Sequence, residues 1–355
     1  MSAGRVLAVR QDGAGDMLLT GPAIRALAHH ADEVTVLAGP GGAETAGLLP
    51  GVDRVLCWPA PWIEAAPPPI GKAETDALIE LVARDRYEHA VVFTSFHQSP
   101  LPTALLLRLG GVRRIAAIST DYPGALLDVR HHVEEDQPEA ERALSLAAAA
   151  GFEPAADDDG RLAVRRPLPS VDSLTGPRPY VVLHPGASAP ARMLSTRGNA
   201  EIVRALVEAG YRVVVTGSAD QRHLTAIVAG GLAVDLGGRT TLAQLAAVLA
   251  GAEAVVAPNT GAAHLAAAVG TPVVCLYAPV VPAVRWAPYR VPHVLLGNQH
   301  APCAGSRARQ CPVVGHPCLE GIAGHEVVDA LAGLPAGRRG EAEVERLAVD
   351  VRRGP

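Results

Sequence analysis

The chain has 355 residues, enough for two domains that each bury a core, so a lone small module is excluded. Hydrophobic residues make up 49% and charged residues 19%, which is typical of a globular protein and excludes a disordered or fibrous one. The net charge is −5 and aromatic residues amount to 3%, so the sequence lacks the basic surface and the stacking aromatics of a nucleic-acid-binding protein.

The five cysteines, an odd number in a chain of this size, favour a reduced cytoplasmic setting. No signal-peptide core is expected, because the short apolar run Val6–Val9 ends at Arg10. The longest apolar stretch, Ala262–Val281, contains a histidine and a proline and is better interpreted as a buried helix followed by a buried strand. We therefore predict a cytoplasmic protein without a transmembrane segment, and peripheral association with the inner face of a membrane stays open.

Strand and helix signals alternate from the N-terminus, a pattern that predicts a parallel sheet covered by helices on both faces. The expected strands are short apolar runs, at Arg5–Arg10, Glu33–Ala38, Asp53–Cys57, Ala90–Thr94 and Arg114–Ile118. The expected helices lie between them, at Asp16–His30, Ala73–Asp85 and Leu101–Leu109.

A change in composition over Glu153–Pro179 predicts a linker, in which Arg161–Val164 could form a short strand. We interpret the acidic run Asp157–Asp159 in this linker as solvated charge rather than as metal ligands. The alternation then restarts, with strands expected at Tyr180–His184, Arg212–Thr216, Ala233–Asp235, Ala254–Ala257 and Val273–Tyr277 and helices at Thr196–Ala209, Ala219–Ala229, Thr241–Leu249 and Gly261–Val269.

These patterns predict an α/β protein of two Rossmann-like domains, residues 1–165 and 166–335, followed by a helical tail over residues 336–355. Two such domains normally leave a cleft at the carboxyl ends of their strands, and ligands bind there. Chemistry is therefore expected in the loops that follow strands.

The first such loop, residues 12–16, follows the opening strand. Gly13 and Gly15 permit a tight turn, and the turn opens a helix whose N-terminal amides can bind an anion. A dinucleotide fingerprint fits poorly, because Leu18 replaces the third glycine and Asp16 sets a carboxylate where a pyrophosphate should lie. Asp16 is a candidate general base, with helix capping as the alternative.

The second loop, residues 184–192, follows the first strand of the second half. Its small residues allow the backbone to approach a ligand, and the forked cation of Arg192 could bind phosphate oxygens. The alternative is a surface loop with a solvated arginine.

The third loop, residues 258–272, joins a strand that ends at Asn259 to a helix that begins with Thr260 and Gly261. Free amides and the positive end of the helix dipole would suit a diphosphate. His264 lies about one turn from Thr260 and can face the same site, although a lone histidine in an apolar helix is often a core residue.

Segments 10–22, 184–192 and 259–272 resemble glycosyltransferase family 9, the ADP-heptose:lipopolysaccharide heptosyltransferase family, and the similarity extends over about residues 5–335. The resemblance implies a GT-B fold, in which two Rossmann-like domains face each other across a cleft. It also implies inverting transfer of a heptose from ADP-heptose, with no catalytic metal, no cofactor besides this nucleotide-sugar co-substrate, and a donor held mainly by the C-terminal domain.

Carried onto this sequence, the family's proposed base falls on Asp16, and Arg192 stands where many members have a phosphate-binding lysine. Asn259 stands where the lipopolysaccharide enzymes often have aspartate, and either departure could change the donor. The acceptor could be a glycan, a lipid-linked sugar or a secondary metabolite. The acceptor-side candidates are Gly13 and Gly15, and the donor-side candidates are His184, Ser188, Arg192, Asn259, Thr260, Gly261 and His264.

Other functions stay open at this point. A nucleotide-sugar epimerase or hydrolase could use the same fold, and a non-catalytic nucleotide-sugar-binding protein would tolerate loss of Asp16. A nicotinamide-dependent oxidoreductase is disfavoured by the broken glycine fingerprint. The late cysteines Cys303, Cys311 and Cys318 lack the close pairing of zinc ligands, so we expect no metal there and thiols that are free or occasionally paired.

Overall fold

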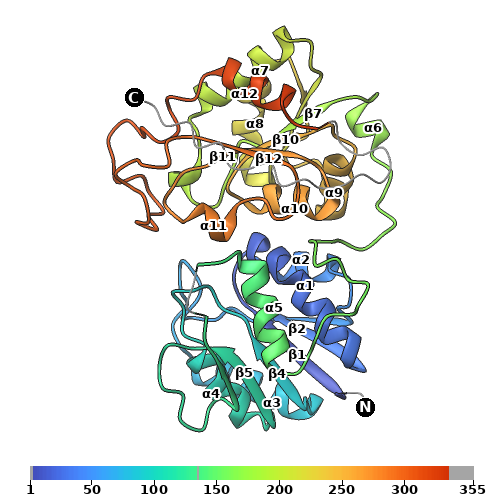
Figure 1. The fold of residues 1–355 in the computed structure, drawn as a ribbon, viewed down its shortest axis with the longest axis vertical. Coiled ribbons are helices and arrows are strands. Elements are labelled where there is room, and N and C mark those ends of the chain that lie inside the picture. Colours follow the sequence, from blue (N-terminus) through green and yellow to red (C-terminus); the bar gives the residue numbers. More distant parts are fainter. Residues whose placement is uncertain (1–2, 134–135, 336–355) are drawn as a thin grey trace. The chain divides into compact units, whose positions relative to one another are not determined.

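The computed structural model describes residues 3–133 and 136–335, and the predicted helical tail over residues 336–355 lies outside this range. The chain divides into two compact units, Met1–Arg165 and Arg166–Pro355, and each unit contains a parallel six-stranded sheet with helices on its faces (Figure 1).

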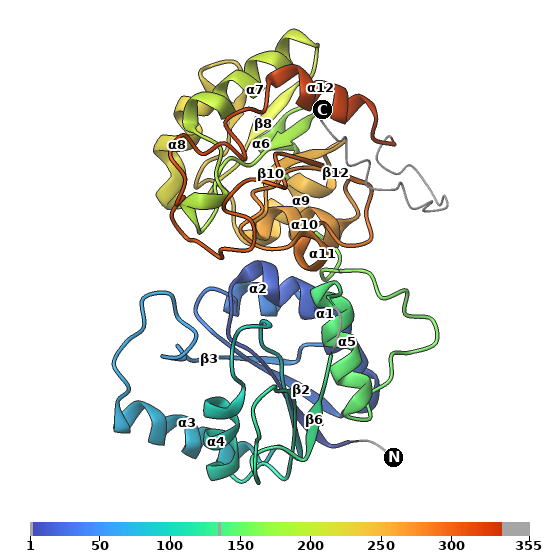
Figure 2. The same ribbon diagram turned by 60° about the vertical axis from the view of Figure 1, so that its left-hand side comes forward.

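The sheet of the N-terminal unit has the order β3-β2-β1-β4-β5-β6. Its strands are β1 (Arg5–Arg10), β2 (Glu33–Ala38), β3 (Arg54–Cys57), β4 (His89–Val92), β5 (Arg114–Ile118) and β6 (Val129–His131). Its helices are α1 (Ala14–His30), α2 (Ala43–Leu48), α3 (Lys72–Asp85), α4 (Leu101–Leu109) and α5 (Glu139–Ala149). Helices α1 and α5 pack together on one face of the sheet, and α3 and α4 cover the other (Figure 2). Strand β1 lies centrally and is buried over five of its six residues, as its apolar run requires.

The sheet of the C-terminal unit has the order β12-β11-β10-β7-β8-β9. Its strands are β7 (Val181–Leu183), β8 (Val213–Val215), β9 (Val234–Asp235), β10 (Val255–Pro258), β11 (Val273–Leu276) and β12 (His293–Leu296). Its helices are α6 (Asp172–Thr175), α7 (Thr196–Glu208), α8 (Arg222–Ala229), α9 (Leu242–Ala250), α10 (Gly261–Val269), α11 (Ala283–Trp286) and α12 (Gly324–Ala332), with short 3₁₀ turns at Pro190–Arg192 and Ala219–Gln221.

The two sheets share one topology. When the strands of each unit are counted from its own first strand, both sheets have the order 3-2-1-4-5-6. The strand order reverses between β1 and β4 in one unit and between β7 and β10 in the other. In open parallel sheets, ligands bind beyond the carboxyl ends of the strands at this reversal. The fold therefore directs attention to the loops after these four strands.

The segment predicted as a linker differs from expectation in its first half. Arg161–Val164 forms no strand, and Leu162 and Val164 are buried within the N-terminal unit. Asp158, predicted as part of a solvated run, instead forms an ion pair of 2.7 Å with Arg25 of α1. The prediction was wrong for Asp158 because its partner lies 133 residues earlier in the chain, beyond the reach of a local pattern.

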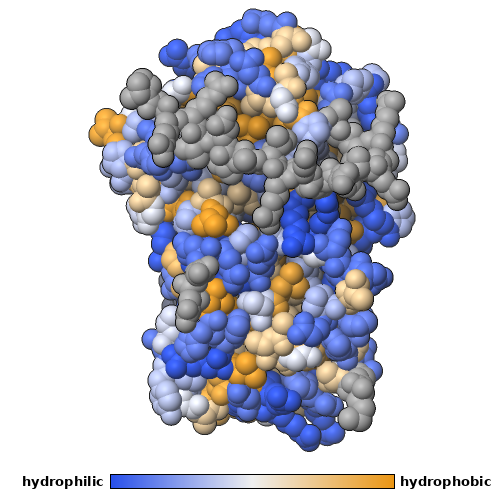
Figure 3. All heavy atoms as spheres, in the orientation of Figure 1, coloured by the Kyte–Doolittle hydropathy of each residue, from blue (hydrophilic) through white to orange (hydrophobic). Residues whose placement is uncertain are grey.

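Among the described residues, no helix is both long enough and apolar enough to cross a membrane. The face drawn in Figure 3 is mostly hydrophilic, and its apolar residues lie in small separate groups. Scattered apolar side chains of this kind are normal on a protein surface, so they do not by themselves mark a binding face.

Candidate functional site

A charged cluster occupies the reversal point of the N-terminal sheet. Arg10, the last residue of β1, is 3% exposed. Its Nη2 donates to Asp16 Oδ1 over 2.9 Å and to Ser95 Oγ over 3.0 Å, and its Nε forms an ion pair of 2.9 Å with Asp12 Oδ2. Asp16 comes from α1, and Ser95 comes from the loop after β4. The cluster therefore joins the two loops at which the strand order reverses.

Two further contacts tie these loops together. Gln98 Nε2 donates to Asp12 Oδ1 over 2.5 Å, and the backbone N–H of Ser95 donates to Gln98 Oε1 over 2.9 Å. Burial raises the pKa of Asp12 to about 6, although the charge of Arg10 and the hydrogen bond from Gln98 act in the opposite direction. Asp12 thus titrates close to neutral pH.

The first residue of helix α5 also contacts the charged cluster. Glu139, its first residue, is 3% exposed and lies 4.0 Å from Arg10 and 3.6 Å from Arg142. Burial alone would lower the pKa of Arg10, but the carboxylates of Asp12, Asp16 and Glu139 raise it overall. Arg10 therefore stays charged inside the protein.

Asp16 lies at the start of α1. Gly13 is the N-cap residue, and no side chain caps this helix. Asp16 lies in the first turn and directs its carboxylate to Arg10, with 26% of the side chain exposed. Asp16 thus pairs with Arg10 and stays partly exposed to solvent, and its role as the base stays a prediction. Apart from its chain neighbours, no described residue lies within 4 Å of where a Cβ on Gly13 would stand, so this glycine borders open space.

A neutral, hydrogen-bonded arrangement occupies the same place in the C-terminal sheet. His184 directly follows β7, is 9% exposed, and has its Nδ1 3.0 Å from Thr216 Oγ1 at the end of β8. Burial lowers the pKa of His184 to about 4, so the ring is uncharged at neutral pH.

The loop after β10 leads into α10 as predicted. Asn259 is 2% exposed and donates from Nδ2 to the hydroxyl of Tyr277 over 3.2 Å. Thr260 is the N-cap residue, yet its side chain makes no capping hydrogen bond. The backbone N–H of Ala263 donates to the carbonyl of Thr260 over 3.1 Å, so among the described residues the amides of Gly261 and Ala262 are left for another acceptor. His264 lies at the end of this turn and is 2% exposed.

Arg192 ends the 3₁₀ turn of the second loop. Burial raises the pKa of Tyr277, the tyrosine that Asn259 contacts, and the charge of Arg192 acts against this rise. Arg192 Nε is buried without a hydrogen-bond partner among the described residues. The residue as a whole is half-buried, and its binding of phosphate stays a prediction. Ser188, by contrast, is exposed.

A cysteine-containing segment holds this second loop in place. Arg309 accepts a hydrogen bond of 2.9 Å from the backbone N–H of Ala191 and donates one of 3.0 Å to the carbonyl of Ser188. His316 Nε2 lies 3.1 Å from the carbonyl of Ala191. The three late cysteines are free, and no cluster of metal-ligating side chains occurs in the described part of the chain.

Sequence reasoning missed four residues that complete these two arrangements, namely Arg10, Asp12, Glu139 and Tyr277. Arg10 gave a signal, because a charged residue ends an otherwise buried strand. Glu139 gave none, since Arg10, which links it to the rest of the cluster, lies at the other end of the domain sequence.

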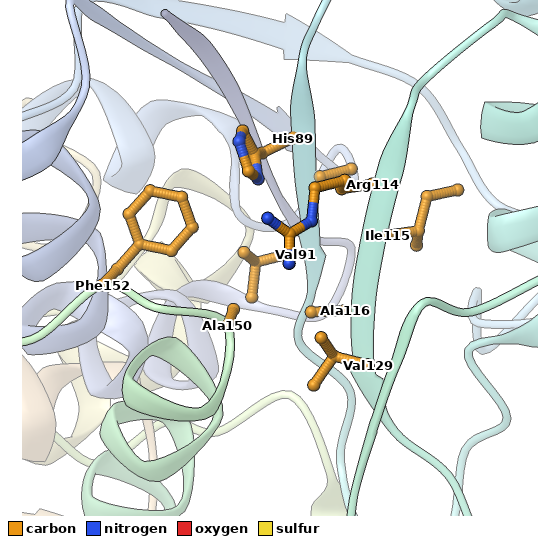
Figure 4. Close-up of a pocket in the computed structure, with 9 residues that line it drawn as sticks. His89, Val91, Arg114, Ile115, Ala116, Val129, Ala150 and Phe152 are labelled. Atoms are coloured by element: carbon orange, nitrogen blue, oxygen red, sulfur yellow. The ribbon is translucent and has the colours of Figure 1, made fainter. Parts of the chain in front are cut away.

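Two cavities lie elsewhere. The first, of about 10 Å³, is lined by His89, Arg114 and Phe152 at the amino ends of β4 and β5 (Figure 4). It could hold about one water molecule and is too small for a substrate. The second, of about 530 Å³, is lined by residues 166–172 and the end of α9. Neither lies at the carboxyl ends of the strands.

Comparison with known proteins identifies the family to which the chain belongs. A model of glycosyltransferase family 9 (heptosyltransferase) matches residues 84–315, more than half of the chain. The chain belongs to this family. The curated lipopolysaccharide heptosyltransferase 2 of Escherichia coli K12 is 31% identical over 118 residues, which are 31% of this chain and 34% of that protein. The match thus spans about a third of the length of this relative.

Solved structures support the fold over most of the chain. The E. coli ADP-heptose lps heptosyltransferase II aligns with a TM-score of 0.70 at 23% identity, covering 92% of this chain and 97% of that one. The E. coli heptosyltransferase WaaC with ADP aligns with a TM-score of 0.66 at 20% identity, covering 92% and 98%. The predicted GT-B architecture of two Rossmann-like domains is confirmed.

Proposed function

We propose that this family 9 protein is an inverting, metal-independent glycosyltransferase that moves a heptose from ADP-heptose to an acceptor hydroxyl. Family membership supports the reaction class, and the relative that was solved with ADP supports the nucleotide. The observation that carries the proposal is the pairing of an uncapped helix start with a buried, unpartnered guanidinium nitrogen at one reversal point.

The donor diphosphate would bind at this place in the C-terminal unit. The free amides at Gly261 and the positive end of α10 favour an anion, and Arg192 adds a full positive charge. As the bond between the sugar carbon and the ADP oxygen breaks, negative charge develops on the diphosphate. Arg192 and the helix start would stabilise that charge in place of a metal ion. His184 is uncharged there and would act through hydrogen bonding only.

The acceptor would bind at the N-terminal unit, where Asp16 exposes its carboxylate. In a single displacement, the acceptor oxygen attacks the sugar carbon, the bond to ADP breaks, and the acceptor proton passes to Asp16. Because attack occurs opposite the leaving group, the configuration at that carbon inverts. The acceptor class is a glycan, a lipid-linked sugar or a secondary metabolite, and the reaction would take place in the cytoplasm, at the inner face of the membrane for a lipid-linked acceptor.

Donor binding and product analysis test this proposal together. The thermal midpoint should rise with ADP-heptose and ADP more than with the corresponding uridine and guanosine compounds, because a ligand of the folded state stabilises it by mass action. With an acceptor panel, ADP release should accompany formation of a glycoside of inverted configuration, measured by NMR. A midpoint that responds only to another nucleotide sugar, or a product of retained configuration, would refute the corresponding part.

A further inference from the structure

Arg10 and Asp16 differ sharply in their access to solvent although they touch each other. The Arg10 side chain is 3% exposed and lies beneath the loop, whereas 26% of the Asp16 side chain is exposed. The contact runs from Arg10 Nη2 to Asp16 Oδ1 over 2.9 Å. A substrate can therefore reach the carboxylate of Asp16 but not the guanidinium behind it.

Arg10 is itself fixed from several sides. Its Nη2 also donates to Ser95 Oγ over 3.0 Å, its Nε pairs with Asp12 over 2.9 Å, and its Nη1 faces Glu139 at 4.0 Å. These partners come from the loop after β1, the loop after β4 and the start of α5. A planar fork with partners on different nitrogens has one orientation, so its contact with Asp16 has a defined direction.

We propose that Arg10 is a positioning residue for the reaction: it holds the Asp16 carboxylate from behind in the orientation that receives the acceptor proton. This inference rests on the proposed function, which makes Asp16 the base. The guanidinium contacts one carboxylate oxygen and would keep the side chain in one rotamer, while the 26% of the side chain that is exposed is where the acceptor would approach. General-base catalysis requires the base within hydrogen-bond reach of the proton, so a small displacement of Asp16 slows the reaction.

Replacement of Arg10 by lysine tests the proposal, because lysine keeps the charge but cannot contact Asp16, Asp12 and Ser95 with one fixed fork. The chain offers a matched control on the helix that carries Asp16. Arg25 makes a bidentate contact with Asp158, two hydrogen bonds of 2.7 Å, and is also largely buried. The variants Arg10→Lys and Arg25→Lys thus remove the same kind of fork, one beside Asp16 and one away from it.

The expected result is a fall of about 10- to 100-fold in kcat for Arg10→Lys, with the KM for ADP-heptose within about twofold of wild type. Arg25→Lys should lose comparable thermal stability and keep wild-type kcat. Crystal structures of both variants should show the Asp16 carboxylate displaced or in several rotamers only in Arg10→Lys. An unchanged kcat with an unmoved Asp16 in Arg10→Lys, or an equal loss of kcat in both variants, would overturn the proposal.

A milder variant covers the case in which Arg10→Lys does not fold. Ser95→Ala removes one acceptor from Arg10 Nη2 without changing any charge, and Ser99→Ala in the same loop is its control. We expect kcat to fall about two- to fivefold in Ser95→Ala only, and equal kcat in the two variants would count against the role of Arg10.

The structural readout separates this inference from the proposed function. If wild type releases no ADP from ADP-heptose with any acceptor, the proposed function fails. A displaced Asp16 in the Arg10→Lys crystal would still support positioning of this carboxylate by Arg10. An undisturbed Asp16 would overturn the positioning role regardless of the reaction.

Discussion

The first strands of the two sheets occupy the same place in the fold, but the residues at their ends differ in charge. Val9 of β1 pairs with Val92 of β4, and Leu183 of β7 pairs with Val256 of β10. The residue that follows in each case, Arg10 or His184, therefore lies at the reversal of strand order. Arg10 is charged among carboxylates, whereas burial holds His184 neutral.

One sheet topology can thus support two different functions, removal of a proton and binding of an anion. Parallel sheets of the same order provide the same crevice twice, and only the side chains after the strands decide what each crevice binds. Carboxylates with an arginine behind them suit removal of a proton, whereas an uncapped helix start with Arg192 and a neutral histidine suits an anion. Five measurements test this contrast between the two units.

The largest effect is expected at Asp16. Asp16→Asn keeps the size of the side chain and removes its basicity, so turnover should fall about 10²- to 10⁴-fold while donor affinity and melting temperature stay nearly unchanged. Asp76→Asn, at an exposed pair with Lys72 on α3, is the control. Steady-state kinetics and thermal melts check this. A loss of stability in proportion to the loss of activity would make Asp16 structural, and full activity would place the base elsewhere.

Arg192→Ala tests the anion side of the comparison. If the guanidinium meets the diphosphate, its loss should weaken transition-state stabilisation by about 2–4 kcal/mol, a fall of about 30- to 1000-fold in kcat/KM. Thr260→Val should weaken donor binding less. Arg197→Ala, which removes an exposed arginine from α7, should leave turnover unchanged. Wild-type turnover and donor affinity in Arg192→Ala would return the arginine to a purely structural role.

The buried neutral histidine should destabilise the fold in acid. Its pKa is about 4 in the folded protein, against about 6.5 when unfolded, so the unfolded state takes up a proton first as pH falls. The stability that His184 provides is fully present above pH 6.5 and should decrease by about 2–3 kcal/mol between pH 7.5 and pH 4.5. His184→Gln should lack this part of the decline in urea unfolding, and parallel pH curves for the two proteins would contradict the assignment.

Asp12 should give the opposite slope. Burial raises its pKa to about 6, so between about pH 4 and 6 the folded state keeps a proton that the unfolded state has lost. Wild type should therefore lose stability relative to Asp12→Asn as pH rises, by about 2 kcal/mol from pH 4.5 to pH 7.5. Urea unfolding of both proteins measures the difference, and a difference that is constant with pH would show that Asp12 is ionised throughout.

The smallest effect concerns metal ions. Because positive charge at the donor side is assigned to Arg192 and the start of α10, chelation with EDTA should change turnover by less than about twofold. Turnover that EDTA abolishes and Mg²⁺ or Mn²⁺ restores would show that a metal carries the leaving-group charge instead.

Much of the regular structure could be predicted from sequence alone. The expected bounds of β1, β2, β5, α4 and α10 agree with the structure residue by residue, because each is a run whose apolar pattern ends at a charge, a turn or a glycine. Strands β6 and β12 were missed, since short half-buried edge strands lack a pattern of their own and form by pairing with a neighbour. Helix α5 was also missed, although Ala140, Ala143 and Leu146 have the spacing of residues on one face of a helix.

The sites divide in the same way. The sequence alone predicts that Asp16 follows β1 at a helix start and that Gly261 begins a helix after a buried strand. Both features depend on neighbours along the chain. The folded sheets alone bring Arg10 to Asp16 together with Ser95, which lies 85 residues away from Arg10, and Asn259 to Tyr277. The reason is physical: local pattern specifies a strand and its turn, whereas the partners of a buried polar group are set by which strand ends the folded sheet brings together.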